Sequence, residues 1–203
     1  MSTSSRELIL SRVRAAIGPH PVSSAEVERR YRTHVDEGID VFLDRLHDYG
    51  ARTWCVPEAE LDAGVREVLA SEGLRRVVTP AGVPDAWVTG FEVLRDSPEL
   101  APTTLDASDG VISTCALAIA QTGTIVLDGS SGMGRRILSL VPDRLVCVVR
   151  AEQIVGSLPQ ALAMLDPLRA LTFVSGPSAT VDIEMVRVAG VHGPRQLAVV
   201  VAV

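Results

Sequence analysis

Two segments bounded by glycines contain most of the side chains that could do chemistry. In the first, residues 122–136, a TGT turn leads through an aliphatic run into the glycine-rich loop GSSGMGRR. In the second, residues 175–194, the sequence SGPSATVDIEMVRVAGVHGP places hydroxyls, carboxylates and a histidine between glycines and prolines. We expect the two segments to form two walls of one site, where a ligand or a partner protein binds.

The glycine-rich loop has the composition of an anion-binding site. Backbone N–H groups around Gly129 and Gly132 can form a nest for a phosphate or a carboxylate, with Ser130 and Ser131 as further donors. Arg135 and Arg136 both supply positive charge. The spacing matches neither a P-loop, which needs Lys followed by Ser or Thr after the glycines, nor the GxGxxG fingerprint. The alternative is a flexible hairpin or surface loop whose arginines are solvated or paired.

The TGT turn offers two hydroxyls at the end of a strand. Thr122 and Thr124, separated by Gly123, can bind a ligand if the turn lies at the carboxyl end of the sheet, where ligands of α/β proteins gather. The alternative is that Gly123 serves a bend while the threonines bond to nearby backbone groups. The placement of the turn decides between the two.

Polar side chains are also concentrated in the second segment. Ser178, Thr180, Asp182 and Glu184 follow a Gly-Pro pair and precede an apolar stretch. They can bind an anion on their backbone amides or hold a carboxylate at the pocket. The alternative is a helix N-terminus, in which Ser178 or Thr180 is the cap and the two acids are stabilised by the helix dipole.

His192, between Val191 and a Gly-Pro pair, is a candidate general base. The alternative is a turn histidine that bonds to nearby backbone. The candidates for a catalytic role are therefore His192, Asp182 and Glu184. We predict no metal site, because the sequence has no HxH or HxxxH pair and its three cysteines are not at CxxC spacing.

The elements that must position these residues have the alternating periods of an α/β fold. β-like runs at 53–56 and 76–79 enclose a helical stretch at 58–72, which is the strand–helix–strand signature of a mainly parallel sheet flanked by helices. A helix is expected from 151 to about 165. Further strands are expected at 87–94, 115–120, 124–127, 145–149, 171–174 and 196–203, the last closing the sheet.

The N-terminus is predicted to be an appendage. Ser4 and Glu7 have capping-box spacing ahead of an apolar run with helical period, and Gly18-Pro19 ends it. We therefore divide the chain into residues 1–23, a helix and linker, and residues 24–203, one α/β domain whose first helix runs to Tyr49. The N-terminal helix can pack on its own body or on a neighbouring subunit.

Bulk composition excludes several classes of function. The formal charge of −6 and the aromatic content of 3% argue against a nucleic-acid or anionic-membrane binder. No apolar run approaches the roughly 18–20 residues of a membrane span, and the N-terminus lacks the apolar core of a signal peptide. We expect a soluble, cytoplasmic protein.

Several motifs, in order, carry a family resemblance. The opening RELILSRVRAAIG, then AQTGTIVL, LVPDRLVCVVRAEQIV, SGPSATVDIE and GVHGP, resemble the lactate utilization protein C family of LUD-domain proteins. The resemblance covers most of the chain and is densest from about Gly110 onward. It implies a fold similar to the NagB/RpiA/CoA-transferase-like group.

The resemblance also implies a function. Members of this family act in the oxidation of L-lactate to pyruvate with partner proteins that bear iron–sulfur clusters. Three cysteines cannot hold a cubane cluster, so no cofactor is expected on this chain. The leading hypothesis is a non-redox subunit or accessory protein that binds a small carboxylate or phosphate, with a homo-oligomer left open. The alternatives are a stand-alone enzyme acting on a sugar phosphate or an acyl-CoA, and a purely structural assembly factor.

One position departs from the family pattern. Relatives are expected to have an acid before the TGT turn, where this chain has Gln121. If that acid were the nucleophile of a CoA-transferase-like reaction, glutamine could not form the acyl intermediate. Covalent acyl chemistry is therefore not expected of this chain.

Overall fold

The computed structural model describes residues 4–18, 30–180, 188–190 and 192–203. The chain divides into two units, Met1–Arg32 and Thr33–Val203. The first contains α1 (Ser5–Ile17), which begins with the predicted capping box: the Ser4 hydroxyl accepts from the Glu7 N–H, and the Glu7 carboxylate accepts from the Ser4 N–H. The predicted N-terminal helix is therefore confirmed, and none of its side chains is buried.

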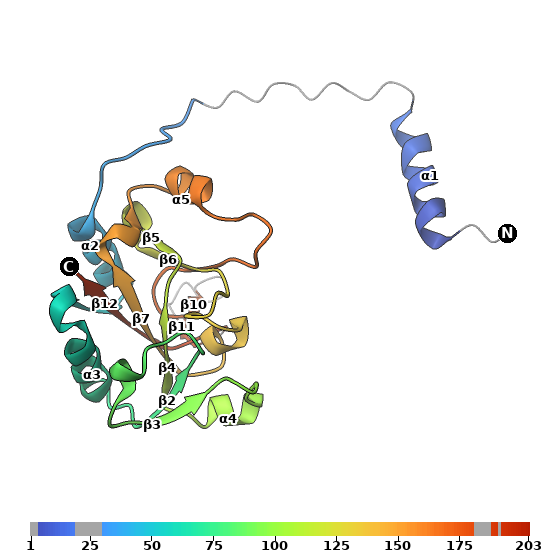
Figure 1. Cartoon of the computed structure of the whole chain (residues 1–203). Coiled ribbons are helices and arrows are strands. Elements are labelled where there is room, and N and C mark those ends of the chain that lie inside the picture. Colours follow the sequence, from blue (N-terminus) through green and yellow to red (C-terminus); the bar gives the residue numbers. More distant parts are fainter. Residues whose placement is uncertain (1–3, 19–29, 181–187, 191) are drawn as a thin grey trace. The chain divides into compact units, whose positions relative to one another are not determined.

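The second unit is organised around a six-stranded sheet in the order β1-β12-β7-β4-β2-β3, in which every neighbouring pair is parallel (Figure 1). This confirms the predicted α/β class with a mainly parallel sheet. The C-terminal strand β12 lies inside the sheet, between β1 and β7. The strands are β1 (Arg52–Val56), β2 (Arg76–Thr79), β3 (Glu92–Arg95), β4 (Gly110–Thr114), β7 (Arg144–Arg150) and β12 (Gln196–Ala202).

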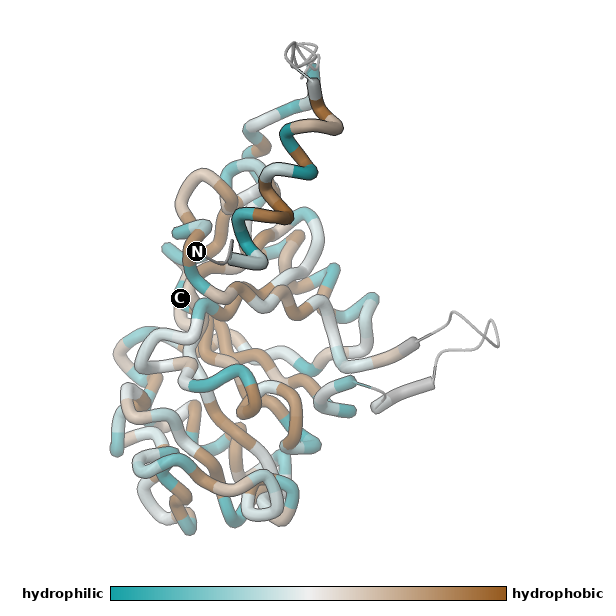
Figure 2. Tube along the Cα trace, turned by 90° about the vertical axis from the view of Figure 1, so that its right-hand side faces the viewer, coloured by the Kyte–Doolittle hydropathy of each residue, from teal (hydrophilic) through white to brown (hydrophobic). Residues whose placement is uncertain are grey.

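Both faces of this sheet are covered, which explains the nearly continuous apolar sequence of its central strands. On one face, Val146, Val148 and Val200 pack against α3 (Leu61–Ser71) and the 3₁₀ turn η2 (Asp85–Val88). The alternate residues of the same strands face a second core. Figure 2 shows the hydrophobic segments gathered in the strands at the middle of this unit.

The second core lies between the large sheet and a smaller one. Ile125 and Leu127 of the smaller sheet contact Cys147 and Val199 of the larger one, together with α2 (Ile39–Asp48). The opposite face of the smaller sheet packs on α5 (Leu158–Met164). Its order is β8-β5-β6-β9, with β5–β6 and β6–β9 antiparallel. These strands are β5 (Leu117–Ile119), β6 (Thr124–Leu127), β8 (Ile154–Val155) and β9 (Thr172–Val174).

Short elements complete the fold. A two-stranded antiparallel pair, β10 and β11, follows β9. The short elements are η1 (Glu58–Glu60), α4 (Pro102–Asp106), η3 (Ala120–Thr122), η4 (Arg136–Ser139), η5 (Ala151–Gln153), β10 (Ala179–Thr180) and β11 (Val188–Ala189). No helix among the described residues is both long and apolar enough to cross a membrane.

The helix predicted from residue 24 to Tyr49 is wrong in its described N-terminal part. Residues 30–38 are not helical, and α2 begins only after Gly38. The reason is a distant contact: the Val35 N–H donates to Gln160 Oε1 at 3.1 Å, and a Cβ on Gly156 would lie 1.9 Å from the Val35 carbonyl oxygen. The segment is therefore held in contact with the start of α5 and does not continue the helix.

Two further elements differ from their predictions. The helix expected over 151–165 is divided into η5, β8 and α5, because β8 pairs with β5 before the chain reaches Pro159. The strand expected over 87–94 begins only at Glu92, since Trp87 lies in η2 and Gly90 turns the chain with a φ of 93°.

Candidate functional site

Three adjoining cavities lie along residues 127–143 and the second glycine-bounded segment. The loop cavity, about 430 Å³, is lined by residues 127–131 and 133–136 and by Pro80 and Asp96, which follow the carboxyl ends of β2 and β3. The β9 cavity, about 320 Å³, is lined by residues 172–179 and 192–194. The rim cavity, about 610 Å³, is lined by residues around Asp143, His192 and Arg195.

Arg136 lines all three cavities. Ser139 and Thr172 line both the loop cavity and the β9 cavity, and His192 lines both the β9 cavity and the rim cavity. The two glycine-bounded segments therefore approach each other at Arg136. The loop cavity lies at the carboxyl edge of the large sheet, where α/β proteins usually bind ligands.

The glycine-rich loop is packed against the large sheet. The Thr114 N–H at the end of β4 donates to the Gly132 carbonyl at 3.0 Å, and the Gly82 N–H donates to the Ser131 carbonyl at 2.8 Å. A Cβ on Gly132 would lie 2.3 Å from Thr114 Oγ1, so glycine is required there for close approach. Gly129 lines the loop cavity, whereas Gly132 is not among the lining residues.

Part of the backbone nest predicted for this loop is used by the loop itself. The N–H groups of Met133 and Gly134 both donate to the Ser130 carbonyl, at 2.9 and 2.8 Å. The Ser130 N–H donates to Asp128 Oδ1 at 3.0 Å, and the other Asp128 oxygen accepts from Arg169 at 2.8 Å. Anion binding by this loop would therefore depend on its remaining N–H groups and on side chains.

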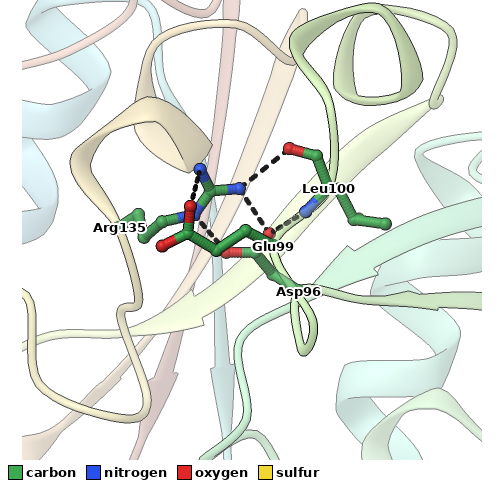
Figure 3. A network of polar contacts seen from close by, with 4 residues as sticks. All are labelled: Asp96, Glu99, Leu100 and Arg135. Carbon is green, nitrogen blue, oxygen red and sulfur yellow. Dashed lines mark hydrogen bonds and ion pairs between the residues drawn. The ribbon is translucent and has the colours of Figure 1, made fainter.

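Arg135 anchors the loop to the end of β3. Its Nε and Nη2 donate to the two Asp96 carboxylate oxygens at 2.7 and 2.6 Å, and Nη2 also donates to the Leu100 carbonyl at 3.0 Å. Figure 3 shows Asp96, Glu99 and Leu100 gathered around this guanidinium. The Asp96 side chain is 3% exposed. The hydrogen bond with Arg135 lowers the pKa of Asp96 and raises the pKa of Arg135, so the charge of Arg135 is already neutralised.

Arg136 has different surroundings. It is the first residue of η4, whose position is fixed by the buried Leu138. In the described part of the chain, no acidic side chain pairs with its guanidinium. The β9 cavity, as far as its described lining goes, contains no carboxylate. The polar side chains that line this cavity are Arg136, His192, Ser139, Thr172, Ser175 and Ser178. Such a lining favours a carboxylate or a phosphate.

Ser178 ties the two ends of the second segment together. Its N–H donates to the Pro194 carbonyl at 2.8 Å, its carbonyl accepts from the Gly190 N–H at 2.8 Å, and its Oγ accepts from the His192 N–H at 3.1 Å. These bonds hold His192 on the wall that it shares with Arg136. The predicted helix cap at Ser178 is wrong, because β10 begins at the next residue.

The other candidates in this segment are less defined. Thr180 pairs through its backbone with Val188 of β11. Asp182 and Glu184 lie outside the described residues. Their proposed roles in ligand binding and catalysis therefore stay predictions.

The TGT turn lies away from all three cavities, packed against α2. Gly123 has a φ of 58°, and a Cβ there would lie 2.7 Å from the Arg45 Cβ. Thr124 Oγ1 is 2.7 Å from Thr122 Oγ1 and 2.8 Å from the hydroxyl of Ser175. These contacts favour the bend interpretation of the turn. Only Ser175 connects it to the β9 cavity.

Gln121 lies beside this turn. It is exposed, its N–H donates to the Gly156 carbonyl at 3.1 Å, and it lines none of the three cavities. A nucleophile at this position would not face the Arg136 site in this chain.

Ser139 and Thr172, whose side chains line both the loop cavity and the β9 cavity, were not predicted from the sequence. Ser139 follows Arg136 by three residues within η4, and this spacing in a helical turn places two side chains on one face. Thr172 is the first residue of β9 and lines both the loop and the β9 cavities. The helical spacing from Arg136 could have pointed to Ser139 as a lining residue. Thr172 could not be found in this way, because it reaches the cavities through the pairing of β9 with β6.

The described residues include no group of three or more His, Cys, Asp or Glu side chains that could hold a metal ion. Cys55 is exposed, whereas Cys115 and Cys147 are buried. The hydrogen bond with Cys147, together with burial, raises the pKa of the Cys115 thiol well above its usual value. This thiol is therefore protonated near neutral pH and is a poor nucleophile.

Comparisons with known proteins agree on one family. Residues 103–202, which include Arg136, Ser139, Thr172, Ser178 and His192, match the LUD domain. A lactate utilization protein C from Deinococcus radiodurans is 46% identical over 188 residues, which cover 90% of this chain and 82% of that protein. A protein with the same description from Bacillus pumilus is 28% identical over 229 residues, covering 94% of this chain and 93% of that protein.

A solved structure supports the same conclusion. The crystal structure of a DUF162 family protein from Deinococcus radiodurans superposes with a TM-score of 0.68 and 40% identity, covering 81% of this chain and 95% of that one. The α/β architecture is therefore shared with an experimentally determined relative. From these matches, and above all from the relative that is 46% identical over 90% of this chain, the chain belongs to the lactate utilization protein C family.

Proposed function

We propose that this chain is a non-redox subunit or accessory protein of an iron–sulfur-dependent system that oxidises L-lactate to pyruvate, and that it binds an organic anion beside Arg136. The name shared by its relatives supports the link to lactate utilization. The observation that carries the anion proposal is the guanidinium of Arg136, which has no acidic partner among the described residues and lines a cavity without a described carboxylate.

The chemistry of the β9 cavity suits an anion. A guanidinium presents a planar fork of donors to a carboxylate or phosphate, and hydrogen bonds to an ionised group are about twice as strong as neutral ones. Thr172 and Ser178 add hydroxyl groups to the lining of this cavity, whereas the Ser139 hydroxyl donates to the Arg136 carbonyl at 2.9 Å. Both the substrate and the product of lactate oxidation are carboxylates, so a subunit without redox chemistry can hold either beside Arg136.

The cysteines of this chain do not fit an iron–sulfur cluster. A cluster is typically held by four cysteine thiolates, whereas the chain has three cysteines. Cys115 and Cys147 are buried in the core, and Cys55 is exposed on β1. In the proposal, partner proteins therefore carry the clusters, and this chain contributes binding and positioning.

Genetic complementation tests the proposal. A strain that lacks the gene is expected to grow on pyruvate but not on L-lactate, and the wild-type gene restores growth on L-lactate. The Arg136→Gln variant is expected to fail, whereas Arg75→Gln, a control at an exposed arginine outside the three cavities, restores growth. Unchanged growth of the deletion strain on L-lactate would contradict the proposed role.

A second candidate function is a stand-alone enzyme of the same fold group that acts on a sugar phosphate or an acyl-CoA. The observation that favours it is that His192 lines two of the three cavities that Arg136 lines, where an imidazole can move a proton on a bound anion. His192→Gln separates the two functions. An enzyme would lose turnover in this variant, while an accessory protein would still complement growth on L-lactate.

A further inference from the structure

The cavities around Arg136 have more room than lactate fills. The β9 cavity of about 320 Å³ and the loop cavity of about 430 Å³ share Arg136, Ser139 and Thr172 in their walls. Pockets of roughly 300–1,000 Å³ hold ligands much larger than a three-carbon acid. Lactate bound to Arg136 would leave most of this space to water, so the volume indicates a longer ligand that extends from one cavity into the other.

The two cavities differ in chemistry. The described lining of the β9 cavity has cationic and hydroxyl groups and no carboxylate. The loop cavity contains the carboxylates of Asp96, Glu99 and Asp128 and the hydroxyls of Ser130 and Ser131. One end therefore suits an anionic head, and the other end is rich in acceptors.

The acceptors of the loop cavity repel a second anionic group but can accept from hydroxyls. Both Asp96 oxygens accept hydrogen bonds from Arg135. Glu99, in contrast, is 74% exposed, and its contact with Arg135 is long, at 3.4 Å. Asp128 accepts one bond on each oxygen, which leaves a free lone pair on each. Carboxylate lone pairs and serine hydroxyls are suitable partners for neutral O–H donors.

We propose that the ligand of the Arg136 site is an extended polyhydroxylated organic anion, with its carboxylate or phosphate head in the β9 cavity and its hydroxyl-bearing tail in the loop cavity. This rests on the proposed function in one respect, since both need Arg136 to bind an anion. It adds the length of the ligand and the chemistry of its tail.

Calorimetry with the full chain tests the ligand class. Gluconate has a carboxylate head, and each of its remaining carbons carries a hydroxyl. Glucitol 6-phosphate has a phosphate head on a similar tail. Hexanoate has the length of gluconate without hydroxyls, and L-lactate has a hydroxyl without the length. We expect the tighter of the two polyhydroxylated probes, which also identifies the head group, to bind about tenfold or more tightly than hexanoate and L-lactate. Equal affinity for L-lactate or hexanoate, or no binding of either polyhydroxylated probe, overturns the proposal.

Two variants in the loop cavity test the position of the tail. Ser131→Ala removes an exposed hydroxyl, and Ala170→Phe fills the cavity from an exposed position without entering the core. Each is expected to weaken the polyhydroxylated probe, about threefold to tenfold for Ser131→Ala, and to leave L-lactate unchanged. If neither variant changes the affinity for the polyhydroxylated probe, the tail does not lie in the loop cavity and the proposal fails.

Arg136→Gln distinguishes failure of this inference from failure of the proposed function. Loss of all probe binding in this variant, but not in Arg75→Gln, supports the anion site on which both proposals rest. If binding depends on Arg136 but not on ligand length or hydroxyls, only the ligand class is wrong. Probe binding that survives Arg136→Gln overturns the anion site itself.

Discussion

Arg135 and Arg136 are adjacent in the sequence, but among the described residues only the guanidinium of Arg135 is paired with acidic side chains. Arg135 forms a bidentate ion pair with Asp96, whose side chain is almost fully buried, and also contacts Glu99 and the Leu100 carbonyl. Arg136 lines three cavities and has no acidic partner among the residues that the structure describes.

This difference gives the two arginines different roles: Arg135 positions the glycine-rich loop, and Arg136 is the candidate for binding an anion. The ion pair of Arg135 fixes the end of the glycine-rich loop to the end of β3, so η4 starts at a defined place and Arg136 is presented to the cavities. A positive charge that is already neutralised contributes little to binding a further anion. Of two consecutive arginines, the candidate for anion binding is therefore the one whose guanidinium is not already paired with an acidic side chain.

The largest expected effect is on stability, from Arg135→Ala. This change leaves the Asp96 carboxylate, 3% exposed, with the Leu100 N–H as its one donor in the part of the chain that the structure describes. Leaving a buried charge without its partner is expected to lower the free energy of unfolding by roughly 3 kcal/mol, measured by urea denaturation. Arg136→Ala is the matched control and should change it by less than about 0.5 kcal/mol. Equal destabilisation by the two variants would contradict the structural role assigned to Arg135 alone.

The pH dependence of the same ion pair gives a smaller effect with a defined sign. Because the hydrogen bond with Arg135 in the folded state lowers the pKa of Asp96 below its ordinary value of 3.8, this carboxylate contributes stability that is fully present above that value. The contribution is lost as the pH falls through the lower, folded-state pKa. The difference in unfolding free energy between wild type and Asp96→Asn should therefore be constant from pH 7 to about pH 5 and shrink toward pH 3. A difference that grows on acidification would contradict the assignment.

Arg136→Lys tests whether binding needs the fork of the guanidinium or only its charge. Lysine retains the positive charge but cannot donate two parallel hydrogen bonds to one carboxylate. We expect the affinity for gluconate to fall about tenfold, which corresponds to about 1.4 kcal/mol, with no change in the free energy of unfolding. Arg135→Lys, in contrast, should lower stability. An unchanged affinity for gluconate in Arg136→Lys would show that positive charge alone is sufficient for binding at this site.

The fold class could be predicted from the sequence, because the central strands are buried on both faces. The apolar run at 145–149 is β7, and the capping box of Ser4 and Glu7 does start a helix. The non-helical conformation of the segment before Gly38 could not be predicted, since the partner of Val35 is 125 residues away. Local periodicity contains no information about such a contact.

The candidate site could be predicted only in part. Arg136, Ser178 and His192 do line one cavity, and each lies close in sequence to a glycine or a proline. The sequence could not distinguish Arg135 from Arg136, because the neutralising Asp96 lies 39 residues upstream. The sequence also suggested that the TGT turn belongs to the site, whereas the structure packs Gly123 against Arg45 of α2. This contact could not be predicted, because α2 is remote in sequence from the turn.

The smallest expected effect concerns that turn. Thr124→Val removes the hydroxyl that links Thr122 to Ser175 but keeps the β-branched shape in β6. Loss of these hydrogen bonds is expected to lower the free energy of unfolding by about 1 kcal/mol. The affinity for gluconate should stay within about twofold of wild type, because Thr124 lines none of the three cavities. A large loss of affinity with unchanged stability would instead place the turn in the site, through Ser175, and would extend the binding role of Arg136 to the end of β6.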